Sequence, residues 1–223
     1  MNSKYDEKVN DIRGKISTLL KNITEANKIS YEAYKENDKA KFQEVQDRLS
    51  NIGVNADIID NEIIKAFALF GPEAIELRSL IAYLKMTNEI VRIGIGIKKY
   101  AQRMREHIDS DCDLEPLNPT ILPLHKSTIT SLELIWECFD NFNECNIDDN
   151  YRKVMVEESK NDDFFSVLEK DIMTHIIDEK ELAIEYVKVL GSLRKLERSC
   201  DRTVNIANLM MYAKNGGEIH LHQ

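Results

Sequence analysis

Residues that interrupt regular structure are scarce in this chain, whose 223 residues include only eight glycines and four prolines. Hydrophobic residues make up 43% of the sequence and charged residues 31%, and leucine, isoleucine, lysine and glutamate are abundant. These residue types favour amphipathic helices, and a chain with few helix breakers can form long ones. The composition therefore predicts an all-α protein, and its length fits two compact units of roughly 100–150 residues.

The sequence also lacks features that define several classes of protein. It has no apolar run near the roughly 18 residues that a membrane-spanning helix needs, and its polar start, MNSKYDEKVNDIRGK, lacks the apolar core of a signal peptide. A formal net charge of −9 and a pI near 5.2 argue against nucleic-acid binding, which requires clustered cations. We expect a cytoplasmic protein that neither spans a membrane nor binds nucleic acid.

Motifs of catalysis are absent as well. There is no P-loop, no GxSxG, no HExxH, and no histidine with a glutamate three residues before it, as a ferritin-like oxidase would have. We therefore expect no enzymatic activity. The four cysteines form no CxxC pair and lack zinc-finger spacing, so reduced thiols in a reducing compartment are expected at Cys112, Cys138, Cys145 and Cys200.

Three of the four prolines fall in one segment, Asp109 to Pro123, which divides the chain almost in half. Apolar residues at helical spacing predict three helices before this linker and three after it. Helices of this kind bury their apolar faces only by packing together. The expected fold is two tandem antiparallel three-helix bundles, each with its own core, over residues 1–110 and 120–215. The predicted helices span residues 6–36, 38–70, 72–107, 124–146, 149–177 and 178–214.

The third and sixth predicted helices look like copies of each other. A shift of 106 residues places Leu84 on Leu190 and Arg92 on Arg198, as an internal repeat would. The sixth helix carries Glu197 and Asp201, which lie about 60° and 100° from the centre of its apolar seam. Two carboxylates on one face can share a cation, but they can equally be solvated acids paired with neighbouring arginines.

Two stretches resemble signatures of the PhoU family. The run LERSCDRTVNIAN, Leu196 to Asn208, resembles the family's closing helix, which typically reads like ERIGDHATNIAE. The run PEAIELR, Pro72 to Arg78, resembles the family's P-x-A-x-D-L-R, with Glu76 in place of the usual aspartate. The six-helix, twofold-repeated plan agrees with that family over nearly the whole chain.

This resemblance implies two three-helix bundles whose E-x-x-x-D motifs bind metal ions. It also implies an accessory, negative regulator of phosphate homeostasis that works with a phosphate ABC transporter ATPase and a sensor histidine kinase. Carried over to this chain, Glu197 and Asp201 are metal ligands, joined by Asp162 and Glu158 from the preceding helix. The metals implied are iron, zinc, manganese or magnesium, and carboxylate oxygens favour the harder ions among them.

The first repeat departs from the family pattern, because Val91 and Ile95 occupy its two acid positions. We expect these side chains to extend a buried seam, so that the N-terminal half binds no metal in the family manner. The acids Asp57, Asp60 and Glu62 are then expected to be a solvated face. This loss leaves open the alternative of a metal-free helical adaptor that has diverged from phosphate regulation, and the sequence is compatible with a homodimer.

Three further features have simpler interpretations. Cys200 stands at a small position in the seam of the last helix and is expected to be buried. Gly94 and Gly96 lie inside a helical pattern, where they would permit close helix packing instead of forming a dinucleotide loop. His220 and His222 are expected in a C-terminal tail.

Overall fold

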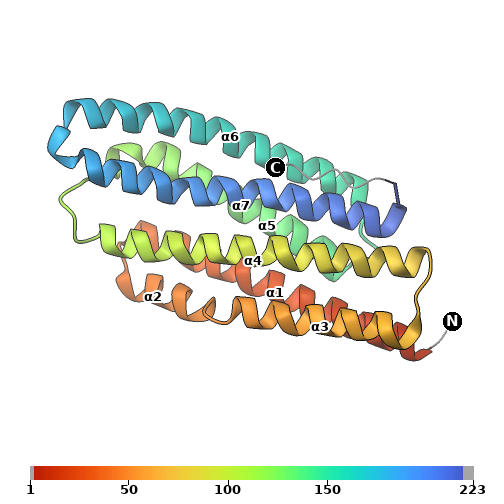
Figure 1. The fold of residues 1–223 in the computed structure, drawn as a ribbon. Coiled ribbons are helices and arrows are strands. Elements are labelled where there is room, and N and C mark those ends of the chain that lie inside the picture. The colour runs from red at the N-terminus through yellow and green to blue at the C-terminus, as the bar shows by residue number, and fades with distance from the viewer. Residues whose placement is uncertain (1–2, 218–223) are drawn as a thin grey trace.

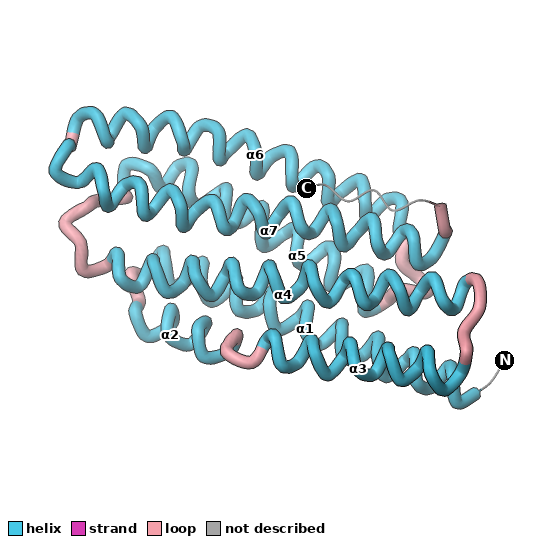
Figure 2. The backbone as a smooth tube through the Cα atoms, in the orientation of Figure 1, coloured by secondary structure: helices cyan, strands magenta, loops and turns pink. Residues whose placement is uncertain are grey.

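The computed structural model describes residues 3–217, and every regular element in this range is a helix (Figures 1 and 2). The all-α prediction is therefore confirmed. The predicted tail with His220 and His222 lies outside the described residues. Among the described helices, none combines the length and the hydropathy that a bilayer crossing requires. The elements are α1 (Ser3–Glu36), α2 (Lys39–Arg48), α3 (Ile52–Phe70), α4 (Ile75–His107), η1 (Glu115–Leu117), α5 (Asn118–Asp140), α6 (Ile147–Asp178), η2 (Lys180–Leu182) and α7 (Ala183–Asn215).

The six-helix plan holds with one interruption. The second predicted helix, residues 38–70, is divided into α2 and α3 by a short turn at residues 49–51. Asp38 caps α2 by accepting hydrogen bonds from the backbone N–H groups of Ala40 and Lys41. The break follows from Ser50 and Asn51, two residue types that compete with helical backbone bonding and favour turns and caps.

Several predicted helix starts are displaced: α7 begins at Ala183 instead of residue 178, with the 3₁₀ helix η2 before it. Two other displaced starts lie near prolines. Helix α4 begins at Ile75, so Pro72 lies in the preceding loop and is not its first residue. Helix α5 begins at Asn118 and not at Leu124, because Pro119 occupies its first turn, where a missing N–H is tolerated, and Pro123 continues the helix. The linker between the halves is therefore shorter than predicted.

The two halves lie against each other along the molecule. Helices α4 and α7 run side by side over most of their length and form the most extensive contact between helices (Figure 1). The buried hydrophobic residues of both halves make one continuous cluster, so the expectation of a separate core in each bundle is wrong. The reason is that α4 buries adjacent pairs such as Ala82–Tyr83 and Ile93–Gly94, a face wide enough to pack in both directions.

The two glycines of α4 permit close helix approach, as predicted. A Cβ atom on Gly94 would collide with the side chain of Ile52 from α3. A Cβ atom on Gly96 would lie 3.3 Å from Ser199 Oγ of α7, which is tight contact. Gly94 therefore permits close packing within the N-terminal bundle, and Gly96 permits close packing between the two halves.

The cysteines are not all free. Cys138 and Cys145 form a disulfide across the turn between α5 and α6, so the expectation of reduced thiols is wrong for this pair. Helix α5 ends at Asp140 and the chain then folds back, which brings the two Cα atoms within 5.3 Å, inside the normal range for a disulfide. Cys112 and Cys200 are free and buried, as expected for Cys200.

Candidate metal centre

The four predicted ligands meet in one pocket between α6 and α7. Glu158 and Asp162 lie one turn apart on α6, and Glu197 and Asp201 lie one turn apart on the antiparallel α7. All four line a pocket of about 430 Å³. The spacing of the acids places each pair on one helix face, and the α6–α7 hairpin turns the two faces toward each other.

Three of these carboxylates converge closely enough to hold one ion. Oxygen atoms of Glu158, Asp162 and Asp201 all lie within 4.8 Å of one another, and the described residues contain no other such group of acidic, histidine or cysteine ligands. Oxygen ligands at 2.0–2.6 Å from a common cation span distances of this size. Glu197 is outside this trio, but its Oε2 atom is buried in the same pocket with no hydrogen-bond partner.

Crowding of like charges and burial change how these carboxyl groups titrate. Burial, reinforced by the charges of Asp201 and Asp162, raises the pKa of Glu197 to about 7. Burial and the charge of Asp162 also raise the pKa of Asp201, against the opposing effect of Arg202. Burial, with a contribution from Asp163, raises the pKa of Asp162. These carboxylates resist ionising together, and a bound cation would remove that repulsion.

The donor set fits a hard cation. Among the described residues, those that line the pocket offer carboxylate and amide oxygens and include neither histidine nor cysteine. Cys200 is fully buried in the core, and burial strongly raises the pKa of its thiol, which disfavours the thiolate that a soft metal would need. Oxygen ligands suit iron(III), manganese or magnesium better than zinc.

Two pocket residues and one neighbour did not emerge from the sequence. Asn205 follows Asp201 by one turn, and the spacing of positions 197, 201 and 205 was the available signal. Arg202 lines the same pocket and donates a hydrogen bond from Nη1 to Glu89 Oε2 at 2.8 Å. Glu89 belongs to α4 in the other half, and a pair 113 positions apart leaves no local pattern.

The corresponding positions of the N-terminal half carry no ligands, but their packing differs from the prediction. Val91 is half-buried, whereas the Ile95 side chain is 41% exposed, so it does not extend a buried seam. The predicted solvated face is also only partly present. Asp57 is exposed, but Asp60 accepts a hydrogen bond from Thr87 of α4 and Glu62 pairs with Lys8 of α1.

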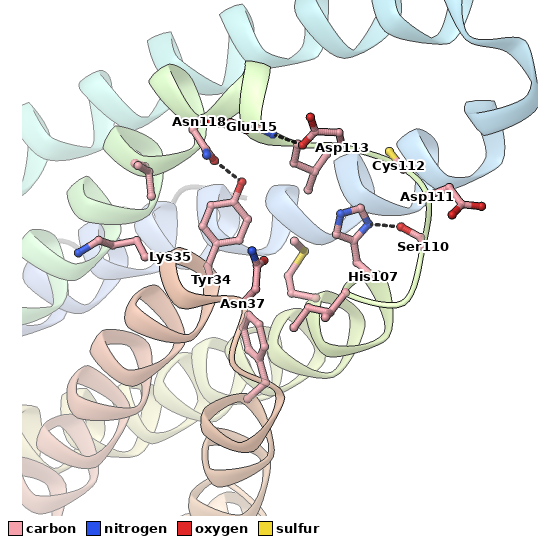
Figure 3. Close-up of a pocket in the computed structure, with 15 residues that line it drawn as sticks. Tyr34, Lys35, Asn37, His107, Ser110, Asp111, Cys112, Asp113, Glu115 and Asn118 are labelled. Atoms are coloured by element: carbon pink, nitrogen blue, oxygen red, sulfur yellow. Dashed lines mark hydrogen bonds between the residues drawn. The ribbon is translucent and has the colours of Figure 1, made fainter.

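A larger cavity, of about 750 Å³, lies where the α4–α5 connection crosses between the halves (Figure 3). Its polar groups bond to one another: Tyr34 donates to Asn118 Oδ1 at 2.6 Å, and the Ser110 hydroxyl contacts His107 Nδ1 at 3.1 Å. His107 Nδ1 also lies 3.0 Å from Glu185 Oε1 of α7. These contacts fix the connection in place, and the acids around this cavity do not converge as those of the α6–α7 pocket do.

Comparison with known proteins agrees with this architecture. The family model described as PhoU domain matches the chain twice, over residues 16–104 and 121–210. The phosphate-specific transport system accessory protein PhoU of Serratia marcescens is 24% identical over 76% of this chain and 68% of its own length. The protein of the same name from Escherichia coli (strain K12) is 21% identical over 97% of this chain and 87% of its own length.

Solved structures show the same fold at low sequence identity. PhoU from Pseudomonas aeruginosa superposes with a TM-score of 0.85 at 19% identity, covering 96% of this chain and 100% of that chain. The phosphate transport system regulatory protein PhoU from Streptococcus pneumoniae superposes with a TM-score of 0.82 at 18% identity, covering 97% and 99%. Because the family model covers most of the sequence in two copies, the chain belongs to the PhoU domain family.

Proposed function

We propose that this protein is an accessory regulator of phosphate uptake that carries one metal-binding centre, formed by Glu158, Asp162, Glu197 and Asp201. The regulatory role is supported by membership of the PhoU domain family and by relatives named as accessory proteins of the phosphate-specific transport system. The observation that supports the metal centre is the convergence of three carboxylates within 4.8 Å of one another. The metal is a hard cation, iron(III), manganese or magnesium, and its role is structural or regulatory.

The output of this regulator is contact with other proteins and not catalysis. We infer that its partners in the cytoplasm are the ATPase of a phosphate ABC transporter and a sensor histidine kinase. A formal net charge of −9 favours basic patches on those partners, since complementary charge speeds association and selects orientation.

Elemental analysis of the purified protein tests the metal centre. We expect close to one equivalent of metal in the wild type and almost none in Glu197→Ala/Asp201→Ala. A matched control, Asp57→Ala, removes an exposed acid from α3 and should keep the metal. Circular dichroism checks that the variants fold. We expect them to fold because burial and neighbouring carboxylates raise the pKa values of both replaced acids, so that their ionised forms do not stabilise the fold. Equally low metal in all three proteins would refute the centre.

Co-purification tests the partners independently of the metal. The tagged protein should enrich the transporter ATPase or the sensor kinase from cells grown in high phosphate, compared with an untagged control. Enrichment of neither would contradict the regulatory role. Enrichment without any bound metal would support the regulatory role and refute the metal centre. Neither enrichment nor bound metal would instead favour the metal-free adaptor that has diverged from phosphate regulation, for which the missing ligands at Val91 and Ile95 are the supporting observation.

A further inference from the structure

Arg202 lies between Glu89 of the N-terminal half and the acidic pocket of the C-terminal half. Its guanidinium Nη1 donates to Glu89 Oε2 of α4 at 2.8 Å, and Glu89 is buried. The same arginine lines the pocket of the candidate metal centre and directly follows Asp201 in the chain.

A guanidinium in that position competes with a metal ion. Arginine presents a planar set of donors that matches a carboxylate in bidentate fashion, so a free Arg202 would pair with the pocket acids and neutralise them. A partly buried, charge-assisted hydrogen bond to Glu89 holds it on the α4 side instead. Asn205, another pocket residue, also donates from Nδ2 to Glu89 Oε2, at 3.4 Å. One carboxylate of the N-terminal half thus orients two side chains of the pocket.

We propose that Glu89 is a positioning residue for the metal centre, holding Arg202 away from Asp201 and its neighbouring carboxylates so that they remain available to a cation. This inference rests on the proposed metal centre. Its consequence is that the cation affinity of the C-terminal half depends on the α4–α7 contact. By thermodynamic linkage, a bound cation stabilises that contact by the same coupling.

Calorimetric titration with Mn²⁺ tests the inference on the full-length protein. Glu89→Gln keeps the shape of the side chain but removes its charge, and should weaken Mn²⁺ binding roughly 10-fold, as is typical when a residue supporting a ligand is lost. Arg202→Gln removes the competing cation and should bind at least as tightly as the wild type. In Glu89→Gln/Arg202→Gln the loss should disappear, leaving an affinity within about twofold of Arg202→Gln.

Two controls separate positioning from general effects. Glu106→Gln removes the same charge from α4 about 25 Å further along the helix, where Glu106 pairs with Arg103, and should leave Mn²⁺ affinity unchanged. Glu89→Asp keeps the charge and should recover part of the affinity, which also covers the case that the amide variant folds poorly.

The outcomes are distinguishable. A 10-fold loss in Glu89→Gln that is abolished by Arg202→Gln supports the positioning role. An unchanged affinity in Glu89→Gln, or an equal loss in both backgrounds, overturns it while leaving the metal centre intact. No Mn²⁺ binding by the wild type overturns both proposals.

Discussion

The buried histidine of α5 makes the stability of this fold depend on pH. His125 is fully buried, its Nε2 lies 2.8 Å from Asn27 Oδ1, and the rings of Tyr31 and Tyr100 pack edge-on against it. Burial lowers the pKa of His125 from its ordinary value near 6.5 to about 3. In the folded protein the imidazole therefore stays neutral at a pH where the unfolded chain takes up a proton.

The sign and size of the effect follow from this difference in pKa. Above about pH 6.5 neither state binds the proton, and His125 imposes no penalty on the fold. As pH falls from 6.5 toward 3, only the unfolded state binds it, so the free energy of unfolding decreases. For a pKa of about 3 in the fold, the loss from this single group is about 2 kcal/mol at pH 5 and negligible at pH 7.5.

Urea unfolding of the wild type and His125→Gln at pH 7.5, 6 and 5 measures this pH-dependent loss of unfolding free energy. The glutamine amide can still donate to Asn27 Oδ1, so the variant should remain folded. The difference in unfolding free energy between the two proteins should shift by about 2 kcal/mol in favour of the variant between pH 7.5 and 5. The raised pKa values of Asp60 and Asp162 act in the opposite direction, but they cancel in the difference. A difference that stays constant with pH would refute the reasoning.

Reducing the disulfide between Cys138 and Cys145 should lower the free energy of unfolding by about 2 kcal/mol, because the bond closes a short loop in the unfolded chain. Thermal melts with and without dithiothreitol test this, and a double serine variant should no longer respond to the reductant. Gly94→Val should cost about 1–3 kcal/mol through its collision with Ile52. Gly191→Ala should instead add about 0.5–1 kcal/mol, since nothing lies within 4 Å of its Cβ position in α7. Similar urea midpoints for the two glycine variants would contradict this contrast.

Features of this fold that depend on local sequence were predictable from it. The helical spacing of apolar residues predicted the long helices, because each helix must bury its apolar face. An antiparallel turn near Asp178 was enough to place Glu158 and Asp162 opposite Glu197 and Asp201, and the structure puts these four residues in one pocket. The prediction succeeded because residues equally far from a hairpin turn lie abreast, whatever packs around them.

Features that depend on contacts between distant segments were not predictable in the same way. Periodicity shows that α4 has an apolar face but not that its wide face packs on both its own bundle and α7. The pairing of Glu89 with Arg202 joins segments that no local pattern connects. The disulfide is not predictable for a different reason, since a separation of seven residues brings Cys138 and Cys145 together only if α5 ends at Asp140 and the turn reverses sharply.

The asymmetry between the repeats has a physical logic that bears on the proposed function. Buried, clustered carboxylates cost stability unless a cation offsets the cost of ionising them. Burial, reinforced by the charges of Asp201 and Asp162, raises the pKa of Glu197 to about 7 for this reason. Val91 and Ile95 remove that cost from the first repeat together with its ligands. The α4–α7 contact nevertheless keeps one buried acid of that repeat, Glu89, bonded to Arg202 beside the remaining cluster. A buried carboxylate is costly unless its ionic partner is retained, and a buried ion pair adds little net stability of its own. The pairing of Glu89 with Arg202 is therefore better explained by its effect on the neighbouring pocket. On this reasoning the N-terminal half would contribute to the proposed metal centre through Glu89 without ligating the metal.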